Sequence, residues 1–173
     1  MHGSLVPAED VDDFIILRMR GFTGKARHLV SHNVLQDEDL PLLEWQLIFS
    51  VARFGTCHLA HITRHTSIDP AHGSRAATAL EKKGLISRMD DANNRRRKLI
   101  SLTPQGQRTF EKVWPLAKNL IGVVQDSLTP DEFQELKRLL DKSNQALEEL
   151  MEHKQSQEQK DTLDPRDMPQ KIA

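Results

Sequence analysis

Residues 69–103 read DPAHGSRAATALEKKGLISRMDDANNRRRKLISLT and carry the strongest structural signals in the chain. The first residues of this stretch are a helix-start signal, because Asp69 can cap free backbone N–H groups and Pro70 suits the first helical position. Gly84 stands where such a helix should stop. The runs LISRM and KLISL then flank DDANNRRR, a turn sequence that ends in positive charge. The stretch predicts a helix over 70–83 followed by a β-hairpin with a basic tip.

The two faces of the predicted helix differ in chemistry. At about 100° per residue, Gly73, Ala76, Ala77 and Leu80 form one stripe, and its small residues allow close packing against a neighbour. The remaining surface carries short or cationic residues, which suit a face that approaches another molecule closely. These residues are Ala71, His72, Ser74, Arg75, Thr78 and Lys82.

Helical signals surround this stretch on both sides. Apolar residues recur at helical spacing over 11–35, Pro41 opens a second helix that ends near Gly55, and a short third helix is expected over about 57–65. Downstream, a helix is expected from Pro104 to about residue 127, with Pro115 bending it. The capping box TPDE at 129–132 starts a last helix, whose apolar stripe ends at Met151.

These elements define the fold class. Two helices joined by a tight turn and followed by a two-stranded wing make a winged helix-turn-helix. The predicted protein is therefore mainly α with a small β-hairpin wing, and it combines this lobe with a helical dimerisation region.

Charge is distributed unevenly along the chain. The formal net charge of the 173 residues is −1, yet residues 53–98 hold ten Lys or Arg against four Asp or Glu, while residues 126–167 hold six against twelve. The middle of the chain thus has the electrostatics of a surface that binds a polyanion. A single cysteine excludes an internal disulfide and fits a reducing compartment. No apolar run approaches the length of a membrane span, so we expect a cytoplasmic protein without a membrane partner.

The basic residues match what a winged helix needs to bind double-stranded DNA. Helix 70–83 would enter the major groove, where Arg75 can read guanine and short side chains can contact thymine methyl groups. The wing tip would carry Arg95, Arg96 and Arg97 to the phosphate backbone or the minor groove.

The chain resembles the MarR family of winged-helix transcription factors over roughly residues 14–151. The resemblance rests on LLEWQLIFSVARFG, on LAHITRHTSIDPAHGSRAATALEKKGLISR, and on the wing signature D-x-R-x5-L-T-x-x-G. That signature reads here as Asn94, Arg96, Leu102, Thr103 and Gly106, with Asn94 in place of the usual Asp. The loss of that charge leaves the wing more positive, unless Asp90 or Asp91 takes over its role.

The resemblance implies a homodimeric regulator that binds a pseudo-palindromic operator, most simply as a repressor released by a small aromatic or phenolic acid. It implies a MarR-type domain (11–151) with a DNA-binding lobe (40–103) and dimerisation helices (11–36 and 104–151). Composition alone predicts a polar N-terminal arm (1–10) and a disordered tail (152–173) that lacks the apolar residues to fold by itself. The resemblance implies no catalytic residues, cofactor or metal. Candidate effector contacts are Arg18, Phe22 and Trp45. The alternative for Arg18 is a salt bridge in the dimer interface, and the alternative for Trp45 is packing in the core.

Other interpretations stay open. The RRRK run is compatible with a solvated charge cluster, and Arg75 with an ion pair to Asp69 or Glu81. The cluster of Cys57, His58, His61 and His65 suggests metal or redox sensing. The alternative interpretation is that the histidines are ordinary, partly exposed helix residues and that Cys57 is a small thiol in the core. Two further functions are a protein-binding adaptor with a winged-helix shape and, less favoured, a zinc-dependent hydrolase, for which HITRH lacks the glutamate base.

Overall fold

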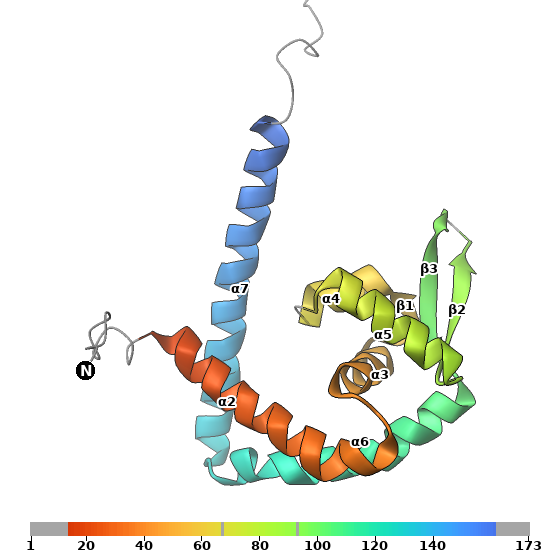
Figure 1. The fold of residues 1–173 in the computed structure, drawn as a ribbon. Coiled ribbons are helices and arrows are strands. Elements are labelled where there is room, and N and C mark those ends of the chain that lie inside the picture. The colour runs from red at the N-terminus through yellow and green to blue at the C-terminus, as the bar shows by residue number, and fades with distance from the viewer. Residues whose placement is uncertain (1–13, 67, 93, 162–173) are drawn as a thin grey trace, which may run out of the picture. The chain divides into compact units, whose positions relative to one another are not determined.

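The computed structural model describes residues 14–66, 68–92 and 94–161 (Figure 1). The chain divides into two compact units, with the boundary between Val123 and Val124. No helix in the described ranges combines the length and the apolar character that crossing a membrane requires.

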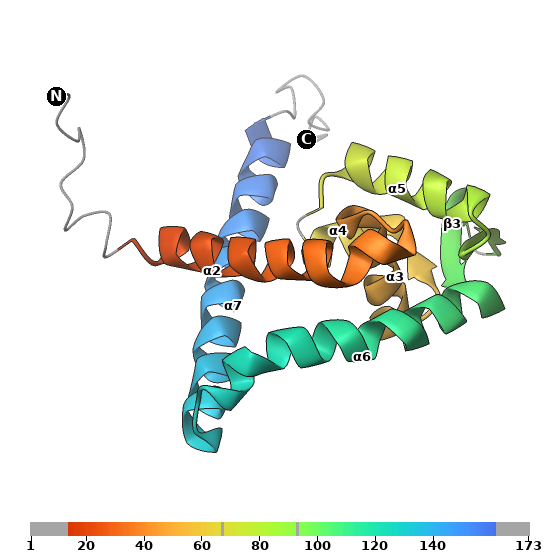
Figure 2. The same ribbon diagram turned by 60° about the horizontal axis from the view of Figure 1, so that its bottom comes forward.

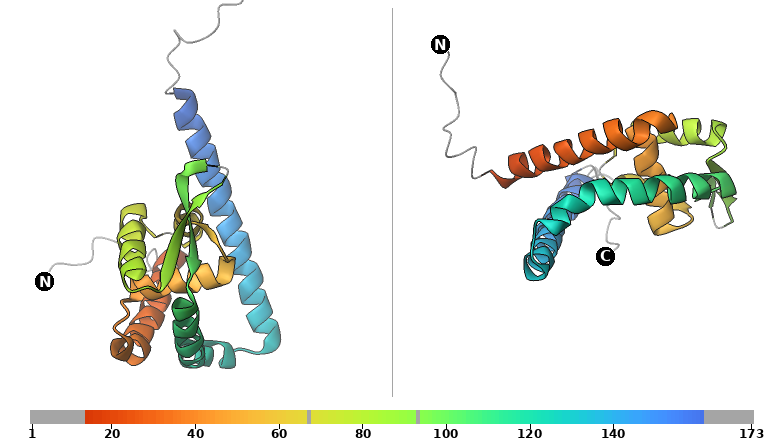
Figure 3. Two further views of the ribbon diagram at one scale, coloured as in Figure 1. Left: turned by 90° about the vertical axis from the view of Figure 1, so that its right-hand side faces the viewer. Right: turned by 90° about the horizontal axis from the view of Figure 1, so that it is seen from below.

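The first unit contains the helix-turn-helix and the wing. Its order is α2 (Ile15–Val30), a π-helical turn (Ser31–Leu35), a 3-10 turn (Gln36–Glu38), α3 (Leu42–Phe54), β1 (Cys57–His58), α4 (Leu59–Thr66), α5 (Pro70–Lys82), β2 (Ile86–Asp91), β3 (Asn94–Leu102) and α6 (Pro104–Asp126). The strands form one antiparallel sheet in the order β1-β3-β2. Helix α5 lies beside the hairpin β2–β3 (Figures 1 and 3). The predicted class, mainly α with a hairpin wing, is confirmed.

One predicted element is wrong in its first two residues. The sequence predicts that Cys57 and His58 begin a helix, but they form β1 and pair with Ile100 and Leu99 of β3. The pairing satisfies backbone groups on the second edge of β3, which would otherwise be left open. A strand of two residues has no alternating pattern, so the sequence did not signal it.

Helix α5 begins and packs as its sequence predicts. Asp69 accepts a 2.9 Å hydrogen bond from the backbone N–H of His72, and this bond is the main cause that lowers the pKa of the Asp69 carboxyl. The stripe of Gly73, Ala76, Ala77 and Leu80 is buried. A Cβ at Gly73 would lie 3.0 Å from the Thr63 methyl carbon, so the small residue lets α4 and α5 approach closely.

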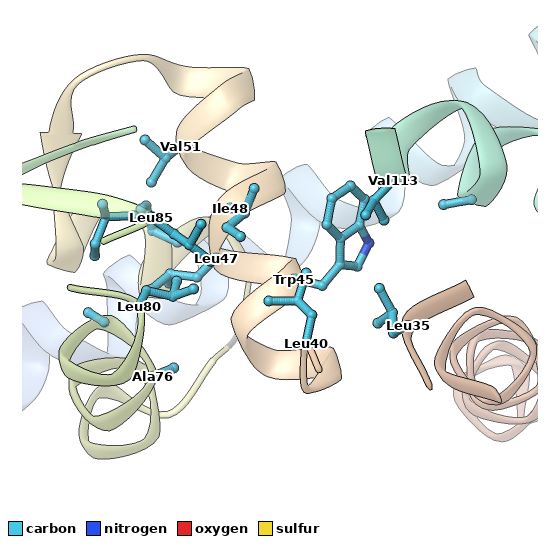
Figure 4. Packing of buried hydrophobic residues seen from close by; sticks show 14 of the residues in the cluster. Leu35, Leu40, Trp45, Leu47, Ile48, Val51, Ala76, Leu80, Leu85 and Val113 are labelled. Carbon is cyan, nitrogen blue, oxygen red and sulfur yellow. The ribbon is translucent and has the colours of Figure 1, made fainter. Parts of the chain in front are cut away.

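The core lies between the helix-turn-helix and the wing and continues along α3 to α6. Leu47 and Ile48 of α3 are fully buried and pack with Leu80 of α5 (Figure 4). Toward α6, Trp45 of α3 lies near Val113. Helix α3 is thus the central element that holds the position of α5.

A compact joint connects the base of the wing to α6, which leaves the end of β3 (Figure 2). The Thr103 hydroxyl donates to the Gly84 carbonyl at 2.6 Å and accepts from the Gly106 N–H at 3.0 Å. A Cβ built at Gly106 would lie 1.9 Å from the Leu85 carbonyl oxygen. The Leu-Thr-x-x-Gly part of the wing signature therefore marks a place where two backbones nearly touch.

The second unit begins at Val124, so it contains the last three residues of α6 as well as helix α7 (Pro130–Asp161). The start of α7 is the predicted capping box: the Thr129 N–H donates to Glu132 Oε2 at 2.8 Å, and the Glu132 N–H donates to Thr129 Oγ1 at 3.3 Å. The helix continues to Asp161, ten residues beyond the expected end at Met151. Residues 152–161 are mostly Glu, Lys and Gln, which favour helix without an apolar stripe.

Candidate nucleic-acid interface

The face of α5 predicted to contact DNA is exposed. All six of its candidate residues are accessible, namely Ala71, His72, Ser74, Arg75, Thr78 and Lys82. A shallow cavity of about 290 Å³ runs along part of this face, lined by Ser74, Arg75, Thr78, Ala79 and Lys82. This face therefore has a shallow hollow, and two of the predicted cations, Arg75 and Lys82, line it.

Arg88, which was not predicted as a site residue, connects this face to the wing. Arg88 of β2 donates from Nη2 to Thr78 Oγ1 at 3.0 Å, and its Nε lies 3.5 Å from Glu81 Oε2. The Thr78 hydroxyl in turn donates to the Ser74 carbonyl at 3.0 Å. The Thr78 hydroxyl has thus donated its one hydrogen and accepts one bond, so the side chain offers an approaching partner its methyl group and one remaining lone pair.

A second basic cavity of about 300 Å³ lies where α4, β1 and the wing meet. Arg64 comes from α4, Arg88 from β2, and Arg97 and Lys98 from β3; His58, Leu59, Ala60 and Ile100 complete the lining. Arg64, Arg88 and Lys98 were missed because sequence spacing does not show that α4 faces β3. The excess of Lys and Arg over residues 53–98 was the available signal.

The acidic residues of the hairpin are paired with neighbouring bases. Asp91 Oδ2 lies 3.1 Å from His58 Nε2, and Asp90 pairs with Lys98. His58 Nδ1 also lies 3.3 Å from the Lys98 carbonyl oxygen. These contacts connect β1 to both wing strands, so Asp90 and Asp91 supply ion pairs in the wing that Asn94 cannot form.

The arginines of the wing are only partly described. Arg97 is exposed and lines the second basic cavity. The side chains of Arg95 and Arg96 lie outside the described residues, so their predicted contacts stay predictions. The backbone of β3 nevertheless carries all three through the hairpin.

The alternative roles of these residues meet little support from the geometry. Among the described residues, Glu81 pairs with Arg88, and no ion pair within 4 Å joins Arg75 to Asp69 or Glu81. After the hydrogen bond from His72, the nearby Arg75 charge is a smaller cause that lowers the pKa of the Asp69 carboxyl. The rings of His61 and His65 lie with their centroids 4.2 Å apart, tilted by 43°. The described part of the chain contains no group of three or more His, Cys, Asp or Glu placed to hold a metal ion. Burial raises the pKa of the Cys57 thiol, which disfavours the reactive thiolate.

A third cavity, of about 370 Å³, belongs to the first unit and adjoins α3 and α6. Its lining is largely aromatic and aliphatic: Val30, Trp45, Gln46, Phe49, Ser50, Thr66, Trp114, Ala117 and Ile121. Of the three candidate effector contacts, Trp45 lines this cavity. Arg18 and Phe22 are exposed on α2 and are not among its lining residues.

Similar proteins share this architecture. Residues 40–98 match the model of the MarR family. YhbI of Bacillus subtilis, an uncharacterized HTH-type transcriptional regulator, is 26% identical over 61% of this chain and 69% of its own. A MarR/EmrR family regulator from Acinetobacter sp. ADP1 has a TM-score of 0.73 at 22% identity, over 80% of this chain and 98% of that one. The Bordetella bronchiseptica regulator BpsR, whose DNA binding is regulated by 6-hydroxynicotinic acid, has a TM-score of 0.65 at 22% identity, over 75% of this chain and 98% of BpsR.

Fold and relatives together define the class as a winged helix-turn-helix transcriptional regulator. The match to the MarR family model covers the helix-turn-helix and most of the wing, the same region whose motifs indicated the resemblance. Both the family and the relatives are transcriptional regulators.

Proposed function

We propose that the protein is a homodimeric, sequence-specific DNA-binding regulator of the cytoplasm that acts as a ligand-released repressor. The observation that carries the proposal is the continuity of the basic surface. Arg88 bonds to Thr78 on the exposed face of α5 and also lines the cavity formed by Arg64, Arg97 and Lys98. A duplex that places α5 in its major groove would bring its backbone against that cavity.

The test is a mobility-shift titration of the full chain on a fragment from upstream of its own gene and on a scrambled duplex of equal length. We expect tighter binding to the upstream fragment and a steep loss of affinity for both duplexes as salt rises. Absence of a shift on either duplex would favour the adaptor that keeps only the winged-helix shape.

Arg64 tests whether the second basic cavity contacts phosphate. Replacing Arg64 by Ala should weaken binding to the upstream and scrambled duplexes alike, because phosphate contacts carry no sequence information. The slope of log K against log salt should flatten by roughly one unit for each phosphate that the variant no longer neutralises, hence by about two in a dimer. Arg53→Ala is the matched control, since Arg53 is exposed on α3 and does not line the cavity. An unchanged slope for Arg64→Ala would remove this cavity from the interface.

The dimer is supported by apolar surface that each unit leaves exposed. On α7 the exposed residues are Leu136, Leu139, Leu147, Leu150 and Met151. In and next to α2 they are Phe14, Ile15, Ile16, Leu17, Phe22 and Leu29. Long helices seldom leave so many large apolar side chains in water unless another chain covers them.

Sedimentation equilibrium should give twice the 19.7 kDa mass of the chain. Leu147→Glu places a charge in the exposed apolar stripe of α7 and should shift the equilibrium toward monomer. Gln134→Glu adds the same charge to the same helix on the side away from that stripe and should leave the mass unchanged. A monomeric wild type, or equal behaviour of the two variants, would contradict this mode of assembly.

Ligand release is supported by the third cavity and by the relative that responds to 6-hydroxynicotinic acid. The cavity lies in the first unit and includes Thr66, the last residue of α4. An occupant would therefore contact the helix that precedes the reading helix, which is how it could alter DNA affinity.

A further inference from the structure

The third cavity has an aromatic wall. Phe49 and Trp114 lie with ring centroids 5.2 Å apart, and Trp45 and Phe49 with centroids 6.2 Å apart. All three residues line the cavity, whose volume of about 370 Å³ is at the small end of the range for ligand sites. Flat aromatic surfaces in a space of this size suit a ligand of one or two fused rings.

Among the residues that the structure describes, none that lines the cavity carries a charge. A carboxylate that entered the cavity would lose its hydration without gaining an ion pair to a cation. Burying an unpaired charge carries a large free-energy penalty. The polar groups available are neutral: the Gln46 amide, two hydroxyls and the indole N–H groups.

The two hydroxyls have already used their hydrogens. Ser50 Oγ donates to the Gln46 carbonyl at 2.7 Å, and Thr66 Oγ1 donates to the Ile62 carbonyl at 2.7 Å. A hydroxyl has one hydrogen to donate, so what each offers a further partner is a lone pair. A ligand that donates a hydrogen bond complements these oxygens, whereas a carboxylate would meet them with lone pairs of its own.

We propose that the cavity takes an uncharged aromatic ligand with an O–H or N–H donor, a phenol being the simplest case. The donor bonds to Ser50 or Thr66, and the ring lies against Trp45, Phe49 and Trp114. This inference rests on the proposed ligand-responsive function and replaces the acid expected from the family resemblance with a neutral donor.

The first test compares three naphthalenes on the full-length wild type at pH 7. The first probe, 2-naphthol, is neutral because phenol pKa values are about 10. The second, 2-naphthoate, is ionised because carboxyl pKa values are about 4. The third, 2-methoxynaphthalene, has no hydrogen-bond donor. Calorimetry measures each affinity. The chain has two Trp, and both line the cavity, so their indole N–H signals in an NMR spectrum report where the ligand binds.

We expect 2-naphthol to bind at least about tenfold more tightly than 2-naphthoate, and about fivefold more tightly than the methoxy compound, which lacks one hydrogen bond. Both indole signals should move with 2-naphthol. Equal or tighter binding of 2-naphthoate would overturn the proposal, and so would indole signals that 2-naphthol leaves unchanged.

A second test reverses the selectivity. Gln46→Arg places a cation in the lining, and 2-naphthoate should then bind at least about tenfold more tightly than to wild type. Gln46→Met is the matched control, because it keeps a long unbranched side chain without charge and should show no such gain. Equal 2-naphthoate affinity in the two variants would overturn the proposal. None of these measurements uses DNA, so a failure of DNA binding and a failure of this ligand class are separate results.

Discussion

Replacing Gly106 by Ala should lower the free energy of unfolding by about 3 kcal/mol or more and weaken DNA binding with it. The new Cβ would lie 1.9 Å from the Leu85 carbonyl oxygen and 2.9 Å from its carbon, so backbone has to move. Forcing extra atoms into a packed site typically costs about 1–3 kcal/mol, and a clash with backbone leaves fewer ways to relax, which is why we expect the upper end or beyond. Chemical denaturation of the full chain measures the change.

Gly122→Ala is the control in the same helix. A Cβ there meets nothing within 4 Å, so the substitution should be neutral or stabilise α6 by up to ~1 kcal/mol through helix propensity. Similar denaturation midpoints for the Gly106 and Gly122 variants would show that the joint between the wing and α6 tolerates movement, contrary to its geometry.

Replacing Arg75 by Ala should cost about 1–3 kcal/mol of operator affinity per half-site, hence roughly 2–6 kcal/mol for a dimer. Arg75 is exposed on the face of α5 that is proposed to contact DNA, and in the described chain no ion pair within 4 Å holds it to Asp69 or Glu81, so its guanidinium can reach a base edge. The loss should be confined to specific sequence, and the preference at one base position should relax. Binding curves on operator and scrambled duplex measure both effects.

Two variants serve as comparisons for Arg75→Ala. Arg75→Lys keeps the charge without the two-pronged hydrogen bonding of arginine, so it should retain non-specific affinity and still lose discrimination. Arg96→Ala at the wing tip should instead weaken specific and non-specific binding together and flatten the salt dependence. If Arg75→Ala discriminates operator from scrambled duplex as well as wild type does, helix 70–83 is not the reading helix.

Local signals predicted the fold wherever one short stretch determines the outcome. Asp69 and Pro70 start α5, Gly84 adopts a φ of +69° after its end, and the capping box at Thr129 starts α7. Strand β1 was missed because its two residues become a strand only by pairing with β3, a partner about forty residues away. The extent of α7 was underestimated because residues 152–161 favour helix through propensity alone, with no apolar face to mark it.

The sequence predicted which cations of the candidate site are exposed, but it did not predict the side-chain contacts between the elements that carry them. The face of α5 followed from helical periodicity, since burial of Gly73, Ala76, Ala77 and Leu80 leaves the other side outward. That Arg88 bonds to Thr78, and that Arg64 shares a cavity with Arg97, depends on how α4, α5 and the wing pack. No spacing in the sequence encodes those contacts.

The bond between Arg88 and Thr78 has a consequence for the chemical state of the operator. With its hydrogen donated and one lone pair engaged, Thr78 cannot donate to a base, and its methyl group can contact the C5-methyl group of thymine. A cytosine methylated at C5 presents a methyl group at the same place in the major groove. The base position facing Thr78 should therefore accept thymine or 5-methylcytosine more readily than plain cytosine, which would make binding there responsive to DNA methylation.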